Sequence, residues 1–298
     1  MIAGIMMLSL KNRDFLTLTD ITGAELERLL QFARQVKKVR YSEELKGKTL
    51  AMLFARTSTR TRVSFEVAMT QLGGHAIHLN WAETNFVKGD MKDEAKNLGL
   101  YCDALMARVF MHKQIMDLAE GCEKPTINGM DDLHHPCQAL ADLLTILESK
   151  ERLDDLKVAW VGDGTNVCNS LLQGTQLLGM EAYVASPKGY EPKIKGNATI
   201  VEDPAEAAKD ADVLVTDTWV SLGQESEKEA RHKAFRPYQL NSRLLSLAKR
   251  DCVVLHCLPA QRGYEITSEV MDSPQSRIFQ EAENRLHAEK ALLLALLL

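Results

Sequence analysis

The sequence predicts an α/β fold with two domains, each a mostly parallel sheet with helices on both faces. Three observations support this prediction. The chain has 298 residues, a length that suits two domains of ordinary size. Short apolar runs typical of buried strands alternate with amphipathic runs typical of helices in both halves. A charged stretch at residues 150–155 separates the halves. Parallel sheets of this kind bind ligands beyond the carboxyl ends of their strands, so we expect an active site in the cleft between the domains.

The predicted elements of the first half begin with a helix at residues 24–38. Thr22 can cap this helix, and Glu25 can complete a capping box. The other elements expected in this half are strands at 49–54, 76–79, 104–109 and 125–128, and helices at 63–72, 90–100, 113–120 and 137–148. Strands that alternate with helices in this way form βαβ units, in which the strands are parallel.

The second half begins with a buried strand at residues 157–161, which leads into the turn Gly162-Asp163-Gly164. Helices are expected at 167–178 and 205–209, and strands at 181–186, 213–217 and 253–256. The turn is similar to the start of a dinucleotide-binding fingerprint, which makes a nicotinamide-dependent oxidoreductase an alternative. Val167 stands where that fingerprint requires a third glycine, so the pyrophosphate site is incomplete. Asn166 is more readily interpreted as a polar contact to a small ligand.

Composition and charge restrict the classes of protein that this chain can belong to. Apolar residues make up 45% and charged residues 26%, as in ordinary soluble proteins, and the net charge of −5 argues against nucleic-acid binding. The six cysteines form no CxxC pair, which favours a reducing cytosol, so we expect a cytoplasmic protein. The apolar ends are shorter than the roughly 20 residues that span a bilayer, and the start lacks the basic region of a signal peptide. We therefore expect no membrane association.

Residues 58–62, Ser-Thr-Arg-Thr-Arg, give the strongest indication of a binding site. They lie between a predicted strand and a predicted helix, and hence at a helix N-terminus. Free backbone N–H groups and the helix dipole favour an anion there. Guanidinium groups pair with phosphate oxygens, and hydroxyl groups can satisfy the remaining acceptors. Because the dipole gives cations no reason to lie at this end, Arg60 and Arg62 predict phosphate binding rather than surface ion pairs.

A second motif, His-Pro-Cys-Gln at residues 135–138, precedes the helix at 137–148. Pro136 can open that helix as its first residue, which would bring His135 and Gln138 near the same helix start. A histidine donor and a glutamine amide suit a polarised carbonyl oxygen with a neighbouring NH2 group. The alternative is an ordinary loop histidine.

Two further motifs follow strands in the second half. Asp217 and Ser221 suit a substrate ammonium group, although Asp217 could instead cap a helix. Cys257 could be a nucleophile, a metal ligand or part of a pocket wall. The soft ligands available for zinc are His134, His135, Cys137, His256 and Cys257. Their spacing does not match the paired ligands of structural zinc sites, so we expect no metal. No local signature of a cysteine protease is present.

Four motifs together resemble the aspartate/ornithine carbamoyltransferase family: residues 54–62, 135–138, 217–221 and 256–259. The resemblance extends from residues 16–20 to residues 282–285. The first two motifs are shared across that family, and the last two are similar to its ornithine branch. The resemblance implies transfer of the carbamoyl group from carbamoyl phosphate to the side-chain amine of L-ornithine, giving L-citrulline and phosphate. It implies no cofactor.

The resemblance also implies roles for individual residues. The groups that would bind carbamoyl phosphate are Ser58, Thr59, Arg60, Thr61, Arg108, His135, Gln138, Cys257, Leu258 and Arg285. Ornithine would be bound by Asn166, Asp217, Ser221 and Leu222. The catalytic groups among these would be Arg60, Arg108, His135 and Cys257. Residues 1–148 with the C-terminal helix 281–298 would form the carbamoyl phosphate domain, and residues 149–280 the ornithine domain. Family members are homotrimers or multiples of trimers, and we expect the same here.

The chain departs from the family pattern at two places. Leu222 stands where methionine is usual; leucine conserves the volume, and the contact is largely through the backbone, so we expect function to survive. Residues 81–88 lack the glutamine that this loop usually lends to a neighbouring subunit, and Asn85 or Lys88 are the candidate substitutes.

Two other interpretations stay open at this stage. The acceptor could be aspartate, putrescine or an acylated ornithine, although Asp217 and Ser221 favour a free α-amino group. A non-enzymatic subunit that binds metabolites would have a broken phosphate-binding segment, whereas residues 58–62 are complete.

Overall fold

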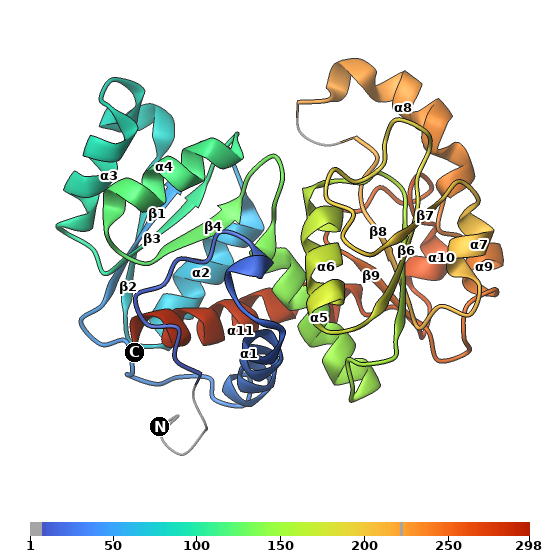
Figure 1. The fold of residues 1–298 in the computed structure, drawn as a ribbon, viewed down its shortest axis with the longest axis horizontal. Coiled ribbons are helices and arrows are strands. Elements are labelled where there is room, and N and C mark those ends of the chain that lie inside the picture. The colour runs from blue at the N-terminus through green and yellow to red at the C-terminus, as the bar shows by residue number, and fades with distance from the viewer. Residues whose placement is uncertain (1–7, 221–222) are drawn as a thin grey trace. The chain divides into compact units, whose positions relative to one another are not determined.

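The computed structural model describes residues 8–220 and 223–298, which form two compact units (Figure 1). The first unit is Met1–Leu144 with Asn284–Leu298, and the second is Thr145–Glu283. Each unit contains one sheet whose strands are all parallel, which confirms the predicted fold class. Ser221 and Leu222, both predicted to bind ornithine, lie outside the described residues.

The sheet of the first unit has helices on both faces. Its strands, in spatial order, are β2 (His75–Asn80), β1 (Thr49–Phe54), β3 (Ala104–Arg108) and β4 (Thr126–Met130). Its helices are α1 (Gly23–Val36), α2 (Thr59–Gln71), α3 (Met91–Gly99), α4 (His112–Cys122), the start of α5 (Pro136–Lys150) and most of α11 (Ile278–Leu297), with single turns η1 (Leu18–Asp20), η2 (Trp81–Glu83) and η3 (Asn85–Val87). Ala51, Leu53 and Leu105 pack in one core with residues of α3 and α4. Figure 1 shows α2 and α11 on the other side of this sheet.

Local sequence explains where the first helices begin. Thr22 caps α1: its hydroxyl accepts a hydrogen bond from the Glu25 N–H at 3.2 Å, and the Glu25 carboxylate accepts one from the Thr22 N–H at 2.8 Å. The predicted capping box is confirmed. The predicted start of the next helix at residue 63 is wrong, because α2 begins at Thr59 with Ser58 as its N-cap. Residues 59–62 are therefore its first turn rather than a loop before it.

The second unit has a five-stranded sheet. Its strands, in spatial order, are β7 (Thr199–Val201), β6 (Glu181–Ala185), β5 (Lys157–Val161), β8 (Val213–Thr216) and β9 (Val253–His256). Its helices are α6 (Asn166–Leu177), α7 (Pro204–Ala208), α8 (Lys228–Phe235), α9 (Ser242–Leu245) and α10 (Ser268–Met271), with single turns η4 (Glu225–Glu227) and η5 (Arg236–Tyr238). Ala159, Leu214 and Val254 pack in one core with residues of α7, α9 and α10. In the part of the chain that the structure describes, no helix is both long and apolar enough to cross a bilayer.

The order of strands creates one crevice in each sheet. From β1 the chain moves outward to β2 and then returns to the other side of β1 as β3. From β5 it moves outward to β6 and β7 and then returns to the other side of β5 as β8. Such a reversal leaves a gap between the loops at the carboxyl ends of the two adjacent strands, and ligands of α/β proteins bind there. Residues 55–62 and Arg108 lie at the first reversal, and residues 162–165 and Asp217 at the second.

Candidate active site

The N-terminus of α2 forms one side of the crevice in the first unit. The Ser58 hydroxyl accepts a hydrogen bond from the Thr61 N–H at 3.4 Å, and the first turn contains no acidic residue to occupy the positive end of the helix. The Arg62 guanidinium lies 2.9 Å from the Glu66 carboxylate, one turn along the surface of α2. Arg62 therefore makes a surface ion pair, which the sequence prediction had argued against. Arg60 is the arginine of this segment whose charge acts on His135, described below.

The ends of β1, β3 and β4 bring the next groups to the same edge. Arg108 is the last residue of β3 and pairs with Phe54, the last residue of β1. The Arg108 carbonyl oxygen accepts a hydrogen bond from the Ala55 N–H at 2.9 Å. On its other side Arg108 pairs with Met130, the last residue of β4, across a shift in register. The loops that follow these three strands consequently start at the same level.

The loop between β4 and α5 is organised by Asp131. One oxygen of this buried carboxylate accepts a hydrogen bond from the His134 N–H at 2.6 Å, and the other lies 2.6 Å from Nδ1 of His112. The helix that follows begins at Pro136, as predicted, and His135 immediately precedes it. The sequence analysis did not identify Asp131, although an aspartate just after a buried strand is a recognisable turn residue.

His135 is buried among three guanidinium groups. Its side chain is 6% exposed. Burial lowers the pKa of His135 well below its ordinary value, and the positive charges of Arg285, Arg108 and Arg60 lower it further. A neutral imidazole retains one N–H donor, which can bind a carbonyl oxygen without adding another positive charge. Four predicted site residues, from α2, β3, the loop before α5 and α11, are therefore close enough to interact electrostatically.

Arg285 connects α11 to the other elements of the site. Its guanidinium is buried and donates hydrogen bonds to Oε1 of Gln138 at 2.9 Å and to Oγ1 of Thr61 at 3.4 Å. The Gln138 amide in turn donates to the Asp142 carboxylate at 2.8 Å. On the other side, the Glu289 carboxylate accepts from Arg285 at 2.7 Å and 3.1 Å. The structure thus joins Thr61, Gln138 and Arg285, and it adds Asp142 and Glu289, which the sequence did not indicate.

Asp217 lies at the crevice of the second unit. Its buried carboxylate accepts hydrogen bonds from the Thr165 hydroxyl at 3.2 Å, the Thr218 N–H at 2.7 Å and the Cys257 thiol at 3.1 Å. Because Thr216 pairs with His256 across β8 and β9, the residues that follow these strands are neighbours. Asn166, the first residue of α6, follows Thr165. The carboxylate therefore joins the turns after β5, β8 and β9.

His256 is engaged with its own loop. Its Nδ1 accepts a hydrogen bond from the Leu258 N–H at 2.9 Å, and its Nε2 lies 3.1 Å from the Glu265 carboxylate. Asp217, His256 and Cys257 have ligand atoms within 4.8 Å of one another, but a metal ion bound to His256 would have to displace one of these bonds. Leu258 has a φ of 58°, a left-handed conformation that is rare for leucine and turns the chain sharply after β9.

Gly164, in the turn after β5, is required by packing within the second unit. The Gly164 N–H donates to the Tyr190 carbonyl at 2.8 Å, and a Cβ atom at residue 164 would lie 2.2 Å from the Pro192 nitrogen. Residues 190–192 therefore lie directly against this turn. This contact explains the glycine without a bound pyrophosphate and removes the main argument for a dinucleotide site.

Arg231 supports the same turn from α8 and was not identified from the sequence. Its buried guanidinium donates to the Asp163 carboxylate and to the Trp219 carbonyl, and it lies 4.9 Å from the centre of the Tyr190 ring. Burial raises the pKa of Asp163 to about 6, although the positive charge of Arg231 partly offsets this effect. Arg231 lies in a run of charged residues that is typical of an exposed helix, so the local sequence does not indicate that its side chain is buried.

The loop at residues 81–88 consists of η2 and η3. The rings of Trp81 and Phe86 lie 5.2 Å apart and pack against the core beneath α3, whereas Asn85 and Lys88 are exposed. That Asn85 or Lys88 contacts a neighbouring subunit stays a prediction.

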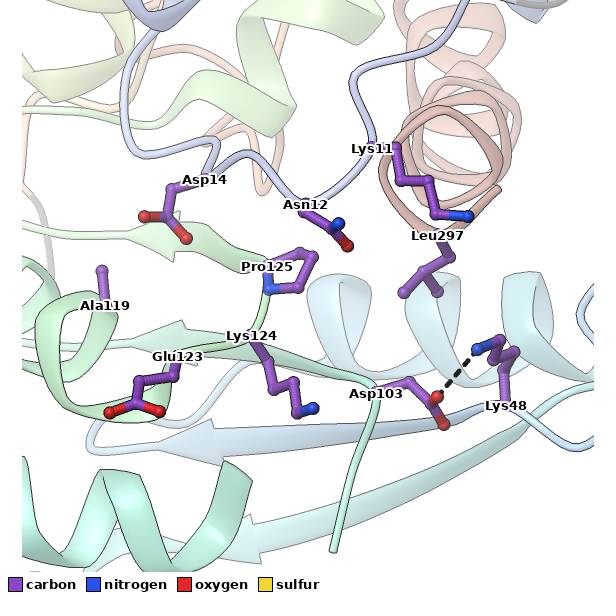
Figure 2. A pocket seen from close by; sticks show the side chains of 10 residues that line it. All are labelled: Lys11, Asn12, Asp14, Lys48, Asp103, Ala119, Glu123, Lys124, Pro125 and Leu297. Carbon is purple, nitrogen blue, oxygen red and sulfur yellow. Dashed lines mark hydrogen bonds and ion pairs between the residues drawn. The ribbon is translucent and has the colours of Figure 1, made fainter. Parts of the chain in front are cut away.

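A pocket at the opposite edge of the first sheet is shown in Figure 2. It lies at the amino ends of the strands, where the Asp103 carboxylate binds the Lys48 ammonium at 2.9 Å and the Thr49 N–H at 2.9 Å. The Asp14 carboxylate accepts from the Thr126 N–H at 2.8 Å, at the start of β4. These acidic groups hold the first residues of two strands, which is a structural role.

Both units of the chain are similar to known proteins. Residues 13–148 match the family described as "Aspartate/ornithine carbamoyltransferase, carbamoyl-P binding domain", and residues 154–296 match its "Asp/Orn binding domain". The chain is 51% identical to an ornithine carbamoyltransferase of Methanosarcina acetivorans, covering 96% of this chain and 99% of the relative.

Solved structures agree with the sequence relatives. Ornithine carbamoyltransferase from Pyrococcus furiosus is 47% identical, with a TM-score of 0.93 over 97% of this chain and 98% of that one. The Thermus thermophilus enzyme is 45% identical, with a TM-score of 0.90 over 97% of this chain and 100% of that one. With both units matched over most of their length, the chain belongs to the aspartate/ornithine carbamoyltransferase family.

Proposed function

We propose that this chain transfers the carbamoyl group of carbamoyl phosphate to the side-chain amine of L-ornithine, giving L-citrulline and phosphate. The observation that carries the proposal is the group of three guanidiniums around the buried, neutral His135 in the crevice of the first unit. This group combines strong positive potential with a neutral hydrogen-bond donor. Carbamoyl phosphate requires both, because its phosphate is anionic and its carbonyl oxygen becomes negative during the reaction.

In the first unit, the phosphate is bound by Ser58, Thr59, Arg60 and Thr61 at the start of α2, where N–H groups and the dipole favour it. Arg108 bridges the phosphate and the carbonyl oxygen, and His135 donates to that oxygen. Gln138 binds the carbamoyl NH2 through its amide oxygen, which Arg285 already orients at 2.9 Å. In this arrangement the hydrogen-bond donors of Arg108 and His135 face the carbonyl oxygen, where negative charge develops during the reaction.

In the second unit, ornithine is bound by its α-amino and α-carboxylate groups. Asp217 accepts from the ammonium group, Asn166 binds the carboxylate, and Ser221 and Leu222 complete the contact. The buried Asp217 carboxylate already receives three donors, and a substrate ammonium competes for the same oxygens. Cys257 and Leu258 follow β9, and the Cys257 thiol donates to the Asp217 carboxylate at 3.1 Å. Cys257 and the Leu258 carbonyl contact the reacting groups.

The reaction needs no covalent intermediate with the protein. The neutral side-chain nitrogen of ornithine attacks the carbamoyl carbon, the bond from that carbon to the phosphate oxygen breaks, and the amine proton leaves with the phosphate. Holding the reactants in contact lowers the barrier by up to about 7–11 kcal/mol. Each hydrogen bond to the developing oxyanion contributes further, and loss of one such donor costs about 2.7–4 kcal/mol.

We further infer the organisation of the active protein. Residues 1–148 with residues 281–298 form the donor-binding domain, and residues 149–280 form the acceptor-binding domain. The active form is a homotrimer or a multiple of trimers in the cytoplasm. Exposed apolar side chains on the first unit, among them Val63, Ile77 and Val87, are consistent with burial by a second copy.

The decisive experiment is an assay for ureido products with carbamoyl phosphate and a panel of amines: L-ornithine, L-aspartate, putrescine and N-acetyl-L-ornithine. We expect product with L-ornithine and with none of the other three amines. Product with another amine and none with ornithine would assign a different acceptor, and no product with any amine would refute the transferase.

The role of Arg60 is tested by Arg60→Ala. We expect kcat to fall by about 100-fold or more, because an oxyanion and phosphate donor is lost, while the thermal unfolding midpoint changes little, since Arg60 is exposed. Arg62→Ala is the matched control, because its surface pair with Glu66 contributes little. Equal activities for the two variants would contradict the assignment of Arg60.

A further inference from the structure

Glu289 is a fully buried carboxylate on α11, one turn beyond Arg285. Both of its hydrogen bonds from Arg285 end on the same oxygen, Oε1, at 2.7 Å from Nη2 and 3.1 Å from Nε. These bonds occupy one edge of the planar guanidinium. The remaining donors then face Gln138 at 2.9 Å and Thr61 at 3.4 Å. Arg285 is thus held between Glu289 on one edge of its guanidinium and Gln138 and Thr61 on the other side.

Among the residues that the structure describes, Arg285 is the ionic partner of Glu289. Burial raises the pKa of Glu289 to about 7, while Arg285 and the Ser64 hydroxyl lower it. Arg285 responds in the opposite sense: burial lowers its pKa, but nearby groups, with the Glu289 carboxylate first among them, together more than compensate and the pKa is raised. Each group thus favours the charged form of the other. The charge of the Glu289 carboxylate and the position of its oxygen could both hold Arg285, and substitutions can separate these two contributions.

We propose that Glu289 is a positioning residue for the carbamoyl phosphate site: its Oε1 holds the Arg285 guanidinium in the orientation that reaches Thr61 and Gln138. The inference rests on the proposed function, in which Arg285 binds carbamoyl phosphate. Glu289 itself contacts no substrate and is not a catalytic residue. Its effect should therefore fall on the donor substrate and leave the acceptor substrate unchanged.

Three substitutions separate position from charge. Glu289→Gln keeps an acceptor oxygen at the same reach and removes the charge. Glu289→Asp keeps the charge and draws the oxygens back by one methylene. Glu289→Leu removes both. If position matters, Glu289→Gln keeps the KM for carbamoyl phosphate within about threefold, whereas Glu289→Asp and Glu289→Leu raise it on the order of tenfold, as expected for one misaligned hydrogen bond from a charged donor.

Lys290→Met is the matched control for lost stability. Lys290 is the next residue of α11 and is equally buried, but its ammonium donates to the Val39 carbonyl at 2.8 Å and to Gln71 at 3.1 Å, away from Arg285. This variant is expected to change the unfolding midpoint and leave both KM values unchanged. If Glu289→Leu does not fold, the comparison of Glu289→Gln with Glu289→Asp decides the question.

The readouts are the KM for each substrate and the Kd for inorganic phosphate measured by calorimetry on the purified full chain. Support requires that only the donor KM and the phosphate Kd rise, in Glu289→Asp but not in Glu289→Gln. The reverse order of these variants, no change in either, or equal changes for both substrates would overturn the proposal. Because phosphate binding needs no turnover, it tests Glu289 even if the wild type forms no ureido product, a result that would instead refute the proposed function.

Discussion

Gly164 offers a test of whether the turn after β5 is shaped by its own packing. In Gly164→Ala, the added Cβ atom would lie 2.2 Å from the Pro192 nitrogen, 2.5 Å from the Glu191 carbonyl carbon and 2.6 Å from the Pro192 Cα. Carbon atoms pack at about 3.5–4.0 Å, so the backbone would have to move by more than about 1 Å. All three atoms belong to the main chain and cannot swing aside as a flexible side chain can.

The expected cost is about 3 kcal/mol, the upper part of the usual range for overpacking. The Gly164 N–H is also bonded to the Tyr190 carbonyl at 2.8 Å, which opposes the shift. Gly89→Ala is the matched control: its Cβ would lie 2.7 Å from Oε1 of Glu94, at the end of a side chain that can rotate, and the change in stability should be within about 0.5 kcal/mol.

Urea unfolding followed by tryptophan fluorescence would measure the effect, because Trp160 and Trp219 lie in the second unit. A midpoint lowered by about 1 M or more is expected for Gly164→Ala, given a slope of about 1–3 kcal/mol per M. Thr165 follows the glycine and donates to Asp217 at 3.2 Å, so the KM for ornithine should also rise. Wild-type stability in Gly164→Ala would refute the packing argument and restore the question of a ligand at this turn.

Three more predictions concern the site and the fold. Asp217→Asn should raise the KM for ornithine at least about tenfold, since a charged hydrogen bond is lost, and leave the KM for carbamoyl phosphate unchanged; equal rises in steady-state kinetics would contradict it. Thr22→Ala removes the cap of α1 and should cost about 1 kcal/mol in urea unfolding; an unchanged midpoint would show that the cap contributes nothing. His135 should stay neutral at and above its ordinary pKa of 6.5, since burial and then Arg285 lower its pKa. Its imidazole NMR signal, assigned by comparison with His135→Asn, should not titrate between pH 6 and 8, and a midpoint near 6.5 would disprove this.

Much of the fold was predictable because local patterns determine it. Buried strands such as β1 and β5 are short apolar runs, Thr22 and Glu25 form a capping box, and Pro136 opens a helix. The start of α2 was misplaced because its first turn is hydroxylic and cationic and lacks apolar periodicity. The strand β7 has three residues, and the helices α9 and α10 have four each, which is too short for a period to appear.

The sequence could indicate candidate site residues near the ends of strands, because parallel strands end at one edge. Arg108 ends β3, and Thr61, His135 and Asp217 lie in segments that follow β1, β4 and β8. Their roles in binding stay predictions. The supporting residues were not predictable, because their roles depend on contacts between distant parts of the chain. Arg231 donates to Asp163 across 68 positions of the sequence. The proposed role of Glu289 depends on the bond from Arg285 to Thr61, which are 224 positions apart. No local pattern distinguishes such residues from ordinary surface charges.

The place of Arg285 in the chain has a consequence for biosynthesis. The first unit consists of Met1–Leu144 and Asn284–Leu298, so the ribosome makes all of Thr145–Glu283 before it makes this arginine. A nascent polypeptide that has already formed β1 to β4 still lacks a cation which contacts Thr61 and Gln138. In the proposed function Arg285 binds the donor substrate, so full affinity for that substrate can arise only late in translation. Chains truncated before Arg285 should bind it less tightly.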